Sequence, residues 1–254
     1  MKEIKIGKQI WAAENLNVDI MPNGSLIREV KTNLEWHNAY KSNEPAFYQG
    51  ADGKLYNYFA FTGGVGYSSF EGWKLPTLKD WNQLIQHLGG YAITGYKLKN
   101  KHGWRQDHSY VSKDEVICPN CYSWNETYRS KVPCHECKDT RKIIIAHNGN
   151  GSNEVGFNAI PGCIHGGVPR DESTALEFMS SKLARWWLPE QDYFSELSED
   201  KNWKLVWYKL NGFLEFLGYP GSYPAVTIRE DYTDLFVNMI SKVDGAAIRL
   251  IKIE

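Results

Sequence analysis

The chain has 254 residues, of which 42 % are hydrophobic and 14 % aromatic, so it can close a sizeable core and disorder is excluded as its main state. Its 29 Lys and Arg residues and 30 Asp and Glu residues leave a formal charge of −1, which provides no global field toward nucleic acid or an anionic membrane. The longest aliphatic run, 143–146, is far below the ~20 residues that span a bilayer, so we expect no membrane insertion. The first residues carry no export-signal pattern, and we therefore expect a cytoplasmic location or, for a phage gene, a place in the virion.

Both ends of the chain have the pattern of a β-strand. Residues 3–6 alternate charged residues with isoleucine, Gly7-Lys8 forms a turn, and 9–12 is a second apolar strip. At the other end, the predicted strand 246–253 follows an Asp-Gly turn pair. We expect the two terminal strands to pair, which would bring the chain ends together.

Residues 77–88 carry the clearest helix pattern. Thr77 can cap the helix, and Asp80 stands at the third helical position as its capping-box partner. Gly89-Gly90 supplies the left-handed stop. One apolar stripe at i, i+3, i+4 and i+7 is formed by Trp81, Leu84, Ile85 and Leu88.

The remaining segments mix helix-like and strand-like patterns. Residues 173–187 begin like a capped helix and end like a strand, so both alternatives stay open there. The runs 54–59, 205–210 and 235–240 are short, aromatic and β-branched, and Gly, Asn and Pro interrupt the sequence around them. These patterns predict an α+β chain with long loops.

Four of the five cysteines form two C-x-x-C pairs: Cys118 with Cys121, and Cys134 with Cys137. This spacing lets two tight turns present four thiolates to one tetrahedral ion, so we predict a structural zinc site with no open coordination position. Two disulfides are the alternative, which a reducing compartment disfavours. The surrounding segment, 113–142, is poor in aliphatic residues and is predicted to be an inserted zinc knuckle that metal holds together.

Short blocks of sequence occur in order along nearly the whole chain. They are 5–18 (KIGKQIWAAENLNV), 53–57 (GKLYN), 73–77 (WKLPT), 97–99 (KLK), 103–104 (GW), 153–162 (NEVGFNAIPG) and 245–252 (GAAIRLIK). This series resembles the Fibrobacter succinogenes major paralogous domain. The resemblance implies a C-type-lectin-like fold, in which paired terminal strands, flanking helices and long loops form a single domain over 1–254. The segment 213–240 is longer than in most relatives, and we expect an extended loop or hairpin insertion there.

A fold of this kind implies a non-enzymatic binding or adhesion module that recognises a protein or glycan on a cell surface. The lectin-like proteins of bacteriophage tails suggest a virion component docked on another virion protein, such as a receptor-binding tail part. The candidate ligand-binding residues are aromatic: Trp186, Trp187, Tyr208, Tyr219 and Tyr223. Because neighbours on a strand point to opposite sides, we expect one of the two adjacent tryptophans to be buried and the other exposed. The oxygen-rich tripeptides of calcium-dependent sugar binding are absent, so any glycan recognition is expected to be independent of calcium.

An enzyme is the first alternative, because formylglycine-generating enzymes have a related fold and use a cysteine pair. Only Cys163 lies outside the predicted knuckle, so that pair cannot form. Cys163 and His165 stand two residues apart and could point to the same side of a strand as nucleophile and base. The reactivity of the thiol would discriminate this alternative from a packing role.

Nucleic-acid binding through the knuckle is the second alternative. Lys131, Lys138, Arg141 and Lys142 lie near aromatic residues of the same segment. Acidic residues in that segment and the two extra negative charges of a four-thiolate zinc centre oppose it, so we regard nucleic acid as an unlikely partner.

Overall fold

The computed structural model describes residues 1–21, 23–50, 53–65, 70, 72–104, 112–117, 142–147, 150–164, 182–190 and 221–253. The helical elements are α1 (Asn33–Lys41), α2 (Tyr58–Ala60), the π-helical turn η1 (Phe61–Val65), α3 (Leu78–His87) and α4 (Tyr91–Leu98). The strands are β1 (Glu3–Ile6), β2 (Gln9–Ala12), β3 (Arg28–Glu29), β4 (Ala46–Gly50), β5 (Gly53–Tyr56), β6 (Trp73–Lys74), β7 (Ser112–Ile117), β8 (Lys142–His147), β9 (Leu183–Trp187), β10 (Ser222–Arg229), β11 (Leu235–Ser241) and β12 (Ile251–Lys252). The α+β class predicted from the sequence is therefore confirmed, and no helix of the described residues is long and apolar enough to cross a membrane.

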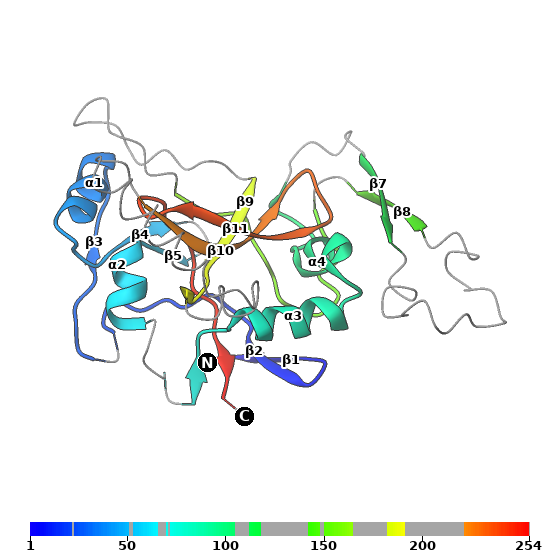
Figure 1. The fold of residues 1–254 in the computed structure, drawn as a ribbon, viewed down its shortest axis with the longest axis horizontal. Helices are drawn as coiled ribbons and strands as arrows, with labels where there is room; N and C mark the ends of the chain where they lie inside the picture. The colour runs from blue at the N-terminus through cyan, green and yellow to red at the C-terminus, as the bar shows by residue number, and fades with distance from the viewer. Residues whose placement is uncertain are drawn as a thin grey trace, which may run out of the picture.

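The two ends of the chain lie in one sheet with the order β1-β2-β12-β6. Strands β1 and β2 form the predicted hairpin, and Gly7 takes the positive φ of 61° that the tight turn requires. Ile251 of β12 pairs with Trp11 on one side and with Lys74 on the other. The expectation is therefore confirmed in part: the C-terminal strand joins the N-terminal hairpin in one sheet, but its neighbour there is β2 and not β1. Figure 1 shows the N- and C-termini close together.

The strand predicted over 246–253 is regular only at Ile251–Lys252. Before this point the chain pairs with a different segment at almost every residue: Gly245 with Ile164, Ala246 with Tyr56, and Ala247 with Trp186. Residues 243–251 are all buried. The C-terminal segment thus passes between the sheets, where neighbours on several sides replace the single regular partner of a strand.

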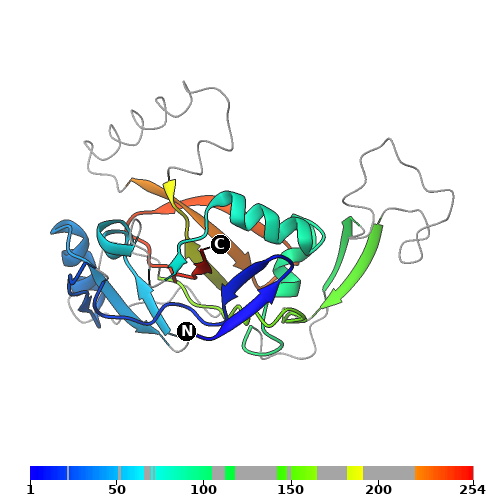
Figure 2. The same cartoon turned by 90° about the horizontal axis from the view of Figure 1, so that it is seen from below.

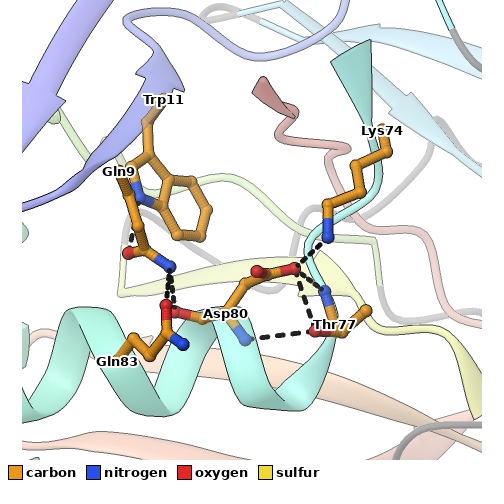
Figure 3. Close-up of polar contacts among 6 residues, drawn as sticks. All are labelled: Gln9, Trp11, Lys74, Thr77, Asp80 and Gln83. Carbon is orange, nitrogen blue, oxygen red and sulfur yellow. Dashed lines mark hydrogen bonds and ion pairs between the residues drawn. The ribbon is translucent and has the colours of Figure 1, made fainter. Parts of the chain in front are cut away.

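Helix α3 begins as predicted. Thr77 accepts a hydrogen bond from the Asp80 backbone N–H, and the Asp80 carboxylate accepts from the Thr77 backbone N–H. Lys74 Nζ, from β6, donates to the same carboxylate at 2.9 Å (Figure 3). From β2, the Gln9 amide donates to the Asp80 carbonyl oxygen at 2.9 Å. The helix start is therefore tied to two strands of the terminal sheet.

The other sheets have the orders β11-β10-β9, β3-β4-β5 and β7-β8. Two buried clusters fill the body. The first contains Trp11, Trp36, Trp81, Trp104, Phe157 and Trp186 among its members, and the second contains Phe47, Tyr56, Phe61, Trp73, Trp187 and Tyr223. Strand β9 contributes adjacent tryptophans to both clusters and so lies between them.

The β7–β8 ribbon projects away from the body in both views (Figures 1 and 2). Its antiparallel register runs from Ser112 opposite His147 to Ile117 opposite Lys142. The four cysteines of the predicted knuckle fall between these strands and lie outside the described residues. The first half of 173–187 also lies outside them, whereas its end forms β9, as the strand-like pattern indicates.

Candidate binding surface

The predicted aromatic ligand contacts that the structure describes are buried. Trp186 and Trp187 are each 1 % exposed and Tyr223 is 2 % exposed. The expectation that one of the two tryptophans faces solvent is wrong. Alternation does place the two rings on opposite sides of β9, but a core cluster covers each side. Rings enclosed in this way offer no surface to a partner.

The indole and hydroxyl groups of these three residues have structural partners. Trp186 Nε1 donates to Asn15 Oδ1 at 2.9 Å, and Trp187 Nε1 donates to the Tyr56 carbonyl oxygen at 2.9 Å. The hydroxyl of Tyr223 accepts from the Glu190 backbone N–H at 3.2 Å. Buried Trp and Tyr side chains need such partners for their polar atoms, so these contacts belong to the core. Tyr208 and Tyr219 lie outside the described residues.

The Cys163 side chain is fully buried beside the ion pair of Arg185 and Asp244, whose Nη1 and Oδ2 atoms lie 3.1 Å apart. Burial raises the pKa of the Cys163 thiol to about 11; Arg185 lowers it and Asp244 raises it further. A nucleophilic cysteine needs the thiolate, which this environment disfavours. His165, the proposed base, lies outside the described residues.

A different surface is formed by the turn 230–234, which joins β10 to β11. The turn is fixed on helix α4: Tyr96 N–H donates to the Thr233 carbonyl oxygen at 2.7 Å, and Thr233 Oγ1 donates to the Ala92 carbonyl oxygen at 2.8 Å. Gly95 allows this approach, because a Cβ atom there would collide with the Asp234 backbone. The turn therefore has one defined position against the helix.

Lys99 fixes the turn from the inside. Its side chain is fully buried, and its Nζ donates to the carbonyl oxygens of Glu230 at 2.9 Å and Tyr232 at 2.7 Å. The same ammonium group lies 5.0 Å from the centroid of the Trp104 ring, within the range of a cation–π interaction. A buried cation is stabilised here by turn carbonyls, so moving the turn would remove its partners.

The outer side of this turn carries three residues that we call the Arg229 platform: Arg229, Tyr232 and Phe236. The Arg229 guanidinium lies 4.2 Å from the Tyr232 ring centroid and 5.5 Å from that of Phe236. The two rings meet edge to face with centroids 6.2 Å apart. Arg229 is exposed, Tyr232 is 41 % exposed and Phe236 is half-buried. An exposed guanidinium thus lies against two aromatic rings.

Arg229 differs from the other arginines within the described ranges. Arg28 and Arg185 form ion pairs with carboxylates, and Arg249 donates to three neutral oxygens. Among those same ranges, no oxygen partner of the Arg229 side chain is found; its contacts are the two rings. The N–H groups of a guanidinium lie in its plane, and a ring packed on its face accepts none of them in the manner of an oxygen atom.

Sequence reasoning missed this platform. It favoured the aromatic residues in 186–223, whereas the exposed ring is Tyr232, in the turn between two strand patterns. A signal was present: Arg229, Asp231 and Tyr232 form a polar and aromatic turn between two apolar runs. A tyrosine in such a turn is more easily exposed than a tryptophan within a strand.

The family model of the Fibrobacter succinogenes major domain matches residues 4–252. Comparison with curated proteins and with solved structures found no match. Because the match extends over almost the whole chain, the protein belongs to the Fibrobacter succinogenes major domain family.

Proposed function

We propose that the protein is a non-enzymatic binding module that contacts a protein or glycan on a cell surface through the Arg229 platform. The proposal depends on the surroundings of Arg229. Its guanidinium is exposed, lies 4.2 Å from the Tyr232 ring centroid and has no oxygen partner in the described part of the chain. Arginine and tyrosine are enriched where binding energy is concentrated.

Pre-organisation of the turn supports the same function. Ordering a loop during binding costs free energy, and a loop that is already fixed avoids this cost. Lys99 and the two hydrogen bonds to α4 fix the turn before any partner arrives. The burial of Cys163, which raises its pKa to about 11, favours binding over thiol catalysis.

The scaffold in this proposal is C-type-lectin-like. Three observations support it: family membership, the presence of both terminal strands in one sheet, and helix α3 packed beside that sheet. Display on a phage particle, with another virion protein as docking partner, stays a prediction from the sequence. Mass spectrometry of purified particles would test it.

The proposal includes a structural zinc ion held by Cys118, Cys121, Cys134 and Cys137. The described residues fit such a site, since Ile117 lies opposite Lys142 and both ends of the cysteine segment start from one end of the ribbon. A two-stranded ribbon alone is only marginally stable in water, so a metal staple beyond its end has a clear structural use.

Metal analysis tests the zinc site. We expect one zinc ion per chain in the purified protein, loss of that ion in a Cys118→Ser variant, and its retention in the control Cys163→Ser. Chelation is expected to expose the segment between β7 and β8 to protease while the unfolding midpoint of the body stays constant. Four thiols that react without any bound metal would contradict the site.

Binding assays on two arrays test the proposed function, one of glycans and one of surface-protein fragments. We expect the wild-type protein to bind at least one class of probe, and Arg229→Gln or Tyr232→Ala to weaken this binding at least tenfold. Arg28→Gln is the matched control, because Arg28 is also exposed but forms an ion pair with Glu44. Absence of binding on both arrays, or binding that these platform variants leave unchanged, would overturn the proposal.

A further inference from the structure

We propose that the Arg229 platform recognises an acidic polysaccharide, with a sugar carboxylate on the Arg229 guanidinium and a pyranose ring against Tyr232. This inference rests on the proposed function and names the ligand class for the same surface. It is carried by two features that lie side by side: a guanidinium without an oxygen partner among the described residues, and a ring that is 41 % exposed.

The guanidinium selects for a carboxylate. Its planar fork matches the two oxygens of a carboxylate, and such paired charge-assisted hydrogen bonds are stronger than neutral ones. Contact with the Tyr232 and Phe236 rings restricts the Arg229 side chain, so less side-chain freedom is lost when a ligand binds. Arg185 and Arg249 already use their donors inside the protein, which leaves Arg229 as the described arginine best placed for an outside acceptor.

The exposed ring favours a sugar over a protein as the source of that carboxylate. A stable protein interface buries about 800 Å² on each partner around an apolar centre. On the turn, Tyr232 is the large exposed hydrophobic residue, and its neighbours Arg229 and Asp231 are exposed and charged. One ring bordered by polar groups is matched in size by one pyranose, whose C–H groups can pack on the ring while its hydroxyls reach those polar neighbours.

A second exposed tyrosine favours a polymer over a single sugar. Tyr91 is 39 % exposed and begins α4. The next residue, Ala92, accepts the hydrogen bond from Thr233, which follows Tyr232. The two exposed tyrosines therefore stand on the two backbone segments that this hydrogen bond joins, and the Tyr91 hydroxyl is held by Asn82 Oδ1.

Asp231 limits the long-range electrostatic attraction between this surface and an anionic ligand. This exposed carboxylate lies on the same turn, which also contains Glu230 and Asp234, so residues 229–234 have more acidic than basic side chains and exert no long-range attraction on an anion. Recognition then depends on the short contact with Arg229 instead of long-range steering, and binding should weaken only moderately as salt increases.

Three soluble polymers separate the elements of this proposal when binding is measured by biolayer interferometry. Polygalacturonate offers a carboxylate on a pyranose, its fully methyl-esterified form offers the pyranose alone, and poly-L-glutamate offers the carboxylate alone. We expect the first to bind at least tenfold more tightly than either of the others. Arg229→Gln should reduce that binding at least tenfold, and Arg229→Lys should reduce it severalfold because charge remains but the planar fork is lost.

Each other outcome overturns the proposal in a distinct way. Equal binding of the methyl-esterified polymer would indicate a neutral sugar, and equal binding of poly-L-glutamate would indicate an acidic protein partner. An equal loss in the control Arg28→Gln would indicate unspecific charge attraction. If no polymer binds but the arrays show a partner that depends on Arg229, the acidic-polysaccharide inference fails and the proposed function stands. Unchanged near-ultraviolet circular dichroism establishes that each variant is folded.

Discussion

Two arginines in this protein stack on an aromatic ring at the same distance and yet have different roles. Arg249 lies 4.2 Å from the Phe157 ring centroid, and Arg229 lies 4.2 Å from that of Tyr232. Arg249 is buried and donates to Asn15 Oδ1 and to the carbonyl oxygens of Ala12 and Phe157. Arg229 is exposed, and the described residues offer it no such acceptor.

A ring contact alone does not set the role of a guanidinium; its oxygen partners do. The acceptors of Arg249 come from the N-terminal segment and from the loop around Phe157, so one side chain joins three parts of the chain. Burial lowers the pKa of Arg249 to about 9, with Glu14 acting in the opposite direction, so the group stays cationic at neutral pH. Its charge is used within the fold, whereas the charge of Arg229 has no such acceptor among the described residues.

We expect Arg249→Met to lower stability more than any other change proposed for this chain. This change removes the donor of three buried or half-buried oxygens, and leaving such groups without partners is costly. We expect the free energy of unfolding to fall by about 3–5 kcal/mol, measured by urea denaturation at pH 7. The control Arg28→Met removes an exposed ion pair and should cost less than about 1 kcal/mol. Similar losses in the two variants would contradict the structural role of Arg249.

The next effect concerns the support beneath the Arg229 platform. Lys99→Met leaves the carbonyl oxygens of Glu230 and Tyr232 without their buried donor, and should lower the free energy of unfolding by about 2–4 kcal/mol. Lys97→Met, which removes the partly exposed ion pair with Glu154, should cost less than about 1 kcal/mol. If the turn is pre-organised by Lys99, any ligand of the platform should also bind more weakly in Lys99→Met than in Lys97→Met.

The raised pKa of the Cys163 thiol predicts a loss of stability at alkaline pH. Its pKa is raised from 9.0 to about 11 in the folded protein, so the folded state holds the proton more tightly than the unfolded state. The resulting stabilisation is complete below pH 9 and is lost as the pH rises to 11, by about 2–3 kcal/mol at roughly 1.4 kcal/mol for each pH unit. The difference in unfolding free energy between wild type and Cys163→Ala should shrink by that amount across this range. A constant difference would show that the thiol has no raised pKa.

Much of the fold could be predicted where the signal is local. The capping box of Thr77 and Asp80 and the turn at Gly7 depend on residues within a few positions of each other, and both are present. The prediction that either Trp186 or Trp187 is exposed was wrong for a different reason. Alternation along a strand tells which rings share a side, but it does not tell whether a second layer covers the other side.

The proposed binding surface depends on contacts that no local pattern contains. Lys99 and Glu230 are separated by 131 residues, and their contact follows from the docking of the β10–β11 turn on α4. The block around Lys99 could be recognised in the sequence, whereas its task of holding the turn appears only when the two elements meet. Likewise, the ring partners of Arg229 are set by the register of β10 and β11.

We expect Arg229→Met to change stability least, and its comparison with Arg249→Met distinguishes the roles of the two arginines. Arg229→Met removes an exposed cation that forms no ion pair in the described part of the chain, and a surface change of this kind should alter the free energy of unfolding by less than about 0.5 kcal/mol. The same substitution at Arg249 is expected to cost at least about six times more, although both guanidinium groups lie 4.2 Å from a ring centroid. Urea denaturation of the two variants side by side measures this contrast. A large loss of stability in Arg229→Met would mean that the platform stabilises the turn. The contacts of Arg229 with the two rings would then have a structural role.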